Sequence, residues 1–233
     1  SASGYNLAAG KGVLVYVFVD TDNDGNTGDS GSNGYLPVTL TVSGTPPTSD
    51  VQIACSYQAD GGGAGSGWNL LGNPYATTID VDQDGDGDGG TMFVDNNASY
   101  NAVVYTYASS SSNYISWNGS IGGLTGGLIK PYQGFFVQAK DTDNQFLFDY
   151  SACNTGGTSG TFYRKRNTMN IGSISFTISV DTNIDKAYVS FMENGEAVMD
   201  DSDAYKLLPF TANDQIVGIS YVEGNALDIN NLP

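Results

Sequence analysis

The sequence predicts an all-β protein, a β-sandwich or jelly-roll-like arrangement of antiparallel sheets, built as one or two modules. Apolar and polar residues alternate over most of the chain, which is the pattern of half-buried strands. The 31 glycines and many Asn, Asp and Ser residues separate the alternating segments with turn-forming positions. No segment of helical length carries the apolar stripe of an amphipathic helix.

The expected strands follow the chain in order. Residues 13–19 form a continuous, Val-rich apolar run, which is typical of a strand that is buried on both faces. The other strands are expected at 38–42, 51–57, 102–108, 114–117, 134–140, 145–149, 174–180, 187–191, 215–222 and 227–230. Many short strands joined by tight turns are typical of sandwiches and jelly rolls.

A small polar spacer, CNTGGTSG at 153–160, divides the chain and is followed by the basic cluster Arg164, Lys165 and Arg166. We therefore expect a β-sandwich with two Asp-rich loops over residues 1–163 and a smaller β module over 164–233. The second part is thin for an independent core. We expect it to pack on the first part, to continue it, or to be completed by another chain.

Composition excludes several functional classes. Eight Lys and Arg residues against 25 Asp and Glu residues give a net charge of −17, which argues against nucleic-acid binding. The absence of histidine excludes His-dependent triads and His metal sites. No apolar run reaches the roughly 18 residues of a membrane span. No hydrolase nucleophile motif, phosphate loop or Cys–His pair occurs, so the sequence predicts no enzyme.

Two aspartate-rich stretches, at 20–29 and 80–90, carry the most informative chemistry, and both begin D-x-D-x-D-G. Alternate carboxylates converge when such a loop curls around a sharp glycine turn, and hard oxygen ligands suit Ca²⁺. The candidate calcium ligands are Asp20, Asp22, Asp24 and Asp29 in the first loop and Asp80, Asp82, Asp84, Asp86 and Asp88 in the second.

Charge repulsion supports the calcium prediction, because so many carboxylates in one short loop oppose folding until a cation neutralises them. The match to an EF-hand is incomplete: Gly31 and Thr91 stand where that motif has its bidentate Glu. The alternative interpretation is a pair of solvated acidic turns. The shorter acidic groups at 141–144 and 200–203 are weaker candidates for cation binding.

Cys55 and Cys153 are the two cysteines of the chain, and each closes an expected strand. They permit one disulfide, which an extracellular location would favour. The alternative is two buried thiols that act as small apolar residues.

Two motifs are distinctive: GWNLLGNPY at 67–75, followed by Ile79 and Asp80, and IKPYQGFFV at 129–137. With the segments 200–206 and 227–233, this order resembles a β-sandwich module of large secreted Bacteroidetes surface proteins, where it often precedes a type IX secretion sorting domain. The resemblance implies export, a cell-surface or extracellular location and β-structure, and it implies no activity. The physical interpretation of these motifs is structural: Trp68 and Tyr75 are expected to anchor a core, and residues 135–137 to form a buried strand.

These observations favour an extracellular, calcium-stabilised structural or adhesive protein. It would be a filament or surface-layer subunit that assembles through strand edges, by self-association or with neighbouring protein domains. The alternative is a non-catalytic carbohydrate-binding module of a secreted polysaccharide-degrading enzyme, in which Trp68 or Trp117 would stack on a glycan.

Overall fold

A computed structural model describes residues 6–15, 43–57, 66–82, 92–96, 98–108, 111, 113–140, 145–153, 170–180, 183–193, 195–208 and 219–233. Strands β1–β13 dominate these segments, together with the one-turn helix α1 (Met92–Asn96) and the 3₁₀ turns η2 (Thr125–Gly127) and η3 (Tyr150–Ala152). The all-β class is therefore confirmed. None of the described helices has the length and apolar character needed to cross a bilayer.

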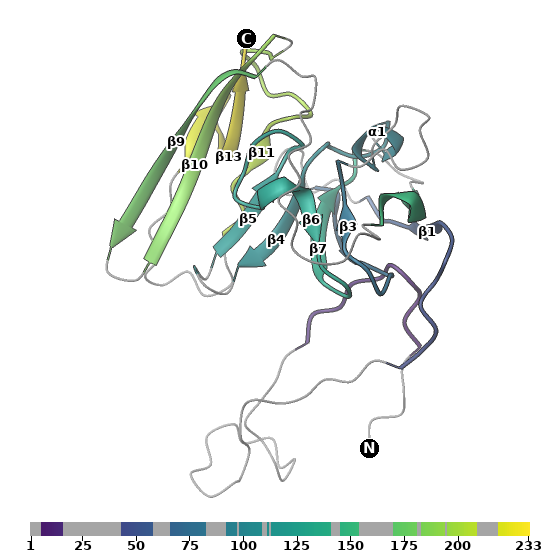
Figure 1. Ribbon diagram of the computed structural model, residues 1–233. Coiled ribbons are helices and arrows are strands. Elements are labelled where there is room, and N and C mark those ends of the chain that lie inside the picture. The colour runs from purple at the N-terminus through teal and green to yellow at the C-terminus, as the bar shows by residue number, and fades with distance from the viewer. Residues whose placement is uncertain are drawn as a thin grey trace, which may run out of the picture.

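A four-stranded antiparallel sheet occupies the centre of the molecule (Figure 1). In spatial order its strands are β2 (Trp68–Gly72), β7 (Gly134–Gln138), β4 (Val104–Ala108) and β5 (Asn113–Trp117). Two antiparallel pairs accompany it: β1 (Val51–Ala54) with β8 (Gln145–Phe148), and β3 (Ile79–Asp80) with β6 (Leu128–Ile129).

A five-stranded sheet contains the C-terminal strands, in the order β11 (Ala204–Tyr205), β13 (Asn225–Leu232), β10 (Asn183–Met192) and β9 (Asn170–Val180), with β12 (Ser220–Val222) paired to β13. Most neighbours are antiparallel, as expected, but β10 and β13 run parallel, with Tyr188 opposite Ile229. Figure 1 shows β9 and β10 as a long hairpin in which β9 is the outermost strand.

The four-stranded sheet contributes side chains to a core on each of its faces. Side chains alternate between the faces of a strand. On β7, Phe135 and Val137 therefore enter one core, while Phe136 packs against another. The first core is shared with β1, β8, β3, β6 and α1, and its rings of Phe135, Phe146 and Phe148 meet edge to face. The structure is thus a sandwich with an added sheet.

The second core joins the C-terminal strands to the four-stranded sheet. Tyr105 of β4 packs there with Tyr188 of β10 and Ile229 of β13. The part of the chain after the spacer therefore packs on the part before it. The expected boundary between residues 163 and 164 falls outside the described residues.

Most expected strands that lie in described segments are present, but the one at 13–19 is wrong over its described part. Val13, Leu14 and Val15 are about half exposed and adopt no strand. The preceding backbone does reach β2, since Gly12 donates its N–H to the Leu70 carbonyl at 3.1 Å. Among the described residues, no backbone hydrogen bond extends this contact to 13–15. The prediction at 38–42, like residues 16–19, lies outside the described residues.

The GNPY sequence links the end of β2 to strands of the two smaller sheets, β6 and β8. Asn73 is 2% exposed, and its amide donates to the carbonyls of Thr77 at 2.8 Å and Ile129 at 3.0 Å. Tyr75 is 1% exposed and donates its hydroxyl to the Phe148 carbonyl at 2.8 Å. The structural interpretation of this motif is confirmed, because these side chains satisfy buried backbone groups.

Two glycines with similar backbone conformations provide a matched test of the packing. Gly67 has φ +76° and Gly224 has φ +84°. A Cβ on Gly67 would lie 2.1 Å from the Ala139 carbonyl oxygen, whereas nothing lies within 4 Å of one on Gly224. We expect Gly224→Ala to lower the free energy of unfolding by about 1 kcal/mol, through backbone strain alone. Gly67→Ala should cost at least about 2 kcal/mol more in urea unfolding; equal effects would contradict this packing.

Candidate functional site

The described base of the second aspartate loop is a tight, buried turn. Asp80 ends β3 and is 7% exposed. Its carboxylate accepts the backbone N–H of Asp82 at 3.0 Å, which bends the chain at the start of the loop. Between them Val81 is 1% exposed and donates its N–H to the Gly127 carbonyl at 3.2 Å. The loop therefore leaves the core from a fixed point.

Trp117 of β5 holds the Asp82 carboxylate. The indole N–H donates to an oxygen of that carboxylate at 2.8 Å. Gly127, with φ +63°, makes room for this arrangement, because a Cβ there would lie 2.6 Å from Val81 and 3.0 Å from the indole ring. The hydrogen bond fixes the position of the Asp82 carboxylate, which is one of the predicted ligands.

The other predicted ligands of the second loop, Asp84, Asp86 and Asp88, lie outside the described residues, as do Asp20, Asp22, Asp24 and Asp29 of the first loop. Within the described segments, no three Asp, Glu or Cys side chains gather closely enough to hold a metal ion. The structure thus places Asp80 and Asp82 at a common turn. The five predicted ligands of this loop are all aspartates, and carboxylate oxygens are ligands that suit calcium.

The acidic group at 200–203 is an internally bonded turn. Asp203 accepts the backbone N–H of Asp200 at 3.0 Å and that of Asn231 at 2.7 Å. Asp200 in turn accepts the N–H of Ser202 at 2.7 Å. Because these carboxylates cap backbone groups, the turn links β11 to β13. Burial raises the pKa of Asp203 to about 6, although the two backbone N–H groups favour the ionised form.

A buried charge cluster lies where the two larger sheets meet. Lys206, which follows β11, places its ammonium 2.7 Å from the Asp185 carboxylate and 2.8 Å from that of Asp228. Ser116 of β5 donates its hydroxyl to Asp228, so the cluster links the five-stranded sheet to the four-stranded sheet. All four residues are less than 9% exposed. We name these residues the Lys206 cluster.

Burial sets the protonation chemistry around the Lys206 cluster. It raises the pKa of Asp228, while Lys206 and Ser116 limit that rise. It also raises the pKa of Tyr105 well above its usual value, with a further contribution from the Asp228 charge. The sequence does not predict this cluster, because its members come from four separate strands or their ends. The one sequence signal is that Lys206 is among only eight basic residues.

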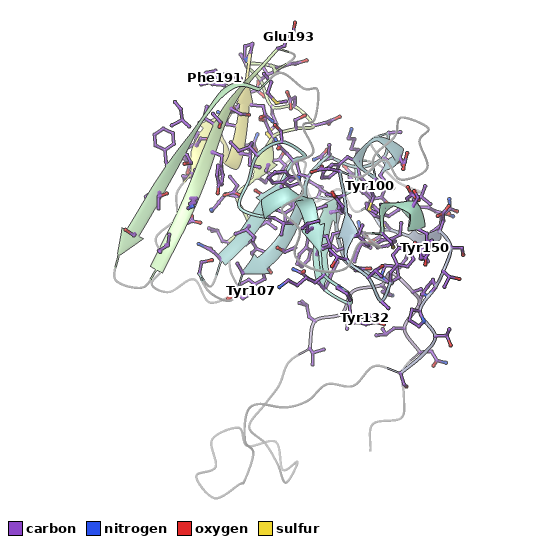
Figure 2. All side chains as sticks on the ribbon, viewed as in Figure 1. Tyr100, Tyr107, Tyr132, Tyr150, Phe191 and Glu193 are labelled. Carbon is purple, nitrogen blue, oxygen red and sulfur yellow. The ribbon has the colours of Figure 1, made fainter. Side chains whose placement is uncertain are left out.

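Neither tryptophan is an exposed platform. Trp68 is partly buried and meets Tyr105 edge to face at a ring separation of 5.0 Å. Trp117 is partly buried against the first core and bonds Asp82. The larger exposed aromatic surfaces are elsewhere, and Figure 2 labels two of them, Tyr107 and Tyr132.

The two cysteines are free thiols, not a disulfide. Cys153 is buried in the first core, and Cys55 packs against that core. Burial raises the pKa of both thiols, which makes each a poor nucleophile at neutral pH. The interpretation as small apolar residues is therefore the one that the structure supports.

Comparison of the chain with protein-family models, with curated proteins and with solved structures finds no match.

Two lysines test the Lys206 cluster against an exposed pair. Lys206→Met would leave two buried carboxylates without their cation, so we expect the free energy of unfolding to fall by about 3–5 kcal/mol at pH 7. Lys140→Met removes a partly exposed contact with Asp201 and should cost only about 0–1 kcal/mol. Urea denaturation measures both. Similar losses in the two variants would contradict the role of the cluster.

Asp203 should make stability depend on pH in a specific direction. Its pKa is about 6 in the folded chain and about 4 when unfolded, so the folded state holds the proton longer. Its contribution to stability therefore falls as pH rises from about 4 to about 6. Asp203→Asn should lower stability by removing a backbone acceptor, and should also remove this pH-dependent component. Urea titrations at several pH values would show it; parallel curves for the two proteins would contradict the assignment.

Proposed function

We propose that this chain is an extracellular, calcium-stabilised structural or adhesive surface protein, a subunit of a filament or surface layer that assembles through strand edges. The observation that carries the proposal is the hydrogen bond from Trp117 to Asp82. It couples a sheet strand to the first turn of an aspartate-rich loop.

Calcium would act as part of the scaffold. The loop carries five aspartates between residues 80 and 88, and their mutual repulsion opposes a compact conformation. A bound divalent cation removes that repulsion and stabilises only the folded state. Backbone and indole N–H groups already hold Asp80 and Asp82, so calcium binding would have to order less of the loop.

An extracellular setting supplies the ion at the concentration that such a site needs. Calcium sites of extracellular modules have dissociation constants of roughly 10⁻⁴–10⁻³ M. The resemblance to secreted surface modules and the low content of charged residues, 14%, support the same location. The carbohydrate-binding alternative gains no support from the tryptophans, since both contribute to packing.

Trp117 gives a direct readout of calcium at the second loop. The chain has two tryptophans, so Trp68→Phe leaves Trp117 as the sole indole. We expect calcium added to the chelator-treated Trp68→Phe protein to change its emission, because the indole is bonded to a predicted ligand. Trp117→Phe is the control, since Trp68 packs in the other core and should not respond.

Charge-matched variants complete the test. Asp82→Asn should weaken calcium binding by about tenfold or more, whereas Asp95→Asn, an exposed residue of α1, should leave it unchanged. At ten times the dissociation constant, calcium should raise the free energy of unfolding by about 1.4 kcal/mol. If calorimetry up to about 10 mM calcium shows no heat, and neither emission nor stability changes, the calcium scaffold is refuted.

A further inference from the structure

The edge strand β9 combines length, exposure and an apolar face. Its 11 residues stand at the end of the five-stranded sheet, where β10 is its single neighbour among the described strands. Every side chain from residue 173 to 179 is exposed. Ile174, Phe176 and Ile178 alternate with Ser and Thr, so they share one face, and they are 49%, 55% and 39% exposed.

Edge strands in soluble proteins usually carry a feature that prevents pairing with another chain, such as a charge, a proline or a very short length. Over residues 170–180 the sequence NIGSISFTISV contains no charged residue and no proline. The net charge of −17 opposes association of two copies, but β9 itself brings no charged side chain to such a contact.

The residue order of β9 favours a second copy of this chain as the partner of this edge. Residues 173–179 read Ser-Ile-Ser-Phe-Thr-Ile-Ser, which is the same in both directions except that Ser175 is matched by Thr177. Two such strands in antiparallel register about Phe176 place like beside like. Phe176 meets Phe176 of the partner subunit, and Ile174 meets Ile178 of the partner subunit. A twofold interface requires self-complementarity of this kind.

We propose that two copies of this chain pair through β9, antiparallel and centred on Phe176, so that the two five-stranded sheets become one continuous sheet. The inference rests on the proposed function for its setting, because it supplies one of the strand edges through which the scaffold would assemble. Cross-strand aromatic and β-branched pairs on the shared face would stabilise the contact. Since a twofold contact is closed, growth into a filament would use another surface.

Sedimentation analysis of the full chain tests the pairing. We expect a reversible monomer–dimer equilibrium that strengthens when salt screens the net charge. Phe176→Lys places two like charges directly opposite each other and should weaken dimerisation by about tenfold or more. Tyr221→Lys, a 65% exposed position on β12, is the matched control and should have no effect. Monomer at all concentrations, or equal dimerisation by both variants, would overturn the proposal.

Cysteine cross-linking tests the register independently of any loss of folding. Phe176→Cys should form a disulfide-linked dimer under mild oxidation, because each residue 176 faces its own copy. Ile174→Cys should cross-link efficiently when mixed with Ile178→Cys and poorly with itself, and Tyr221→Cys should not cross-link. Cross-linking of Ile174→Cys with itself, or larger ladders in place of dimers, would refute this register. These cross-linking results do not affect the calcium-dependent emission of Trp117, which tests the proposed function separately.

Discussion

The two larger sheets can pack together only if the charged side chains buried where they meet are paired with one another. Lys206 meets this condition by pairing its ammonium with both Asp185 and Asp228 within the five-stranded sheet, and Ser116 extends the bonding to the neighbouring sheet. Because a buried ion is costly without its partners, the cluster admits few alternative arrangements. The apolar contacts around Tyr105 add attraction, whereas the polar cluster makes that attraction specific to one alignment of the sheets.

A second constraint on the four-stranded sheet is that it packs against a core on each of its faces. Its strands contribute side chains to two cores, and a residue of β5 can therefore act at either side. Ser116 points to the charge cluster, while the adjacent Trp117 reaches the turn at Asp82. Ser116 and Trp117 are adjacent in β5, so this one strand contacts both the Lys206 cluster and the base of the aspartate loop.

The alternation of apolar and polar residues predicted the class and most strands, because that alternation follows directly from one strand face meeting a core. The prediction failed at Val13, Leu14 and Val15, where a continuous apolar run suggested a buried strand but the side chains are exposed and the residues form no strand. The D-x-D-x-D-G spacing predicted a bend that holds Asp80 and Asp82 together, and the structure places both residues at one turn; their role as calcium ligands stays a prediction. The role of Lys206 could not be predicted, because its partners lie about 20 residues away along the chain on either side and meet only after the sheet has formed.

The place of β13 within its sheet has a consequence for biosynthesis. This strand, at residues 225–232, lies between β10 and β11, which are both made before it. During synthesis, the sheet therefore cannot form between β10 and β11 until β13 has left the ribosome. The pairing of β13 with β10 joins residues about 40 positions apart in the chain. A nascent chain held at that stage would expose unpaired strand edges, which chaperones bind in incompletely folded proteins.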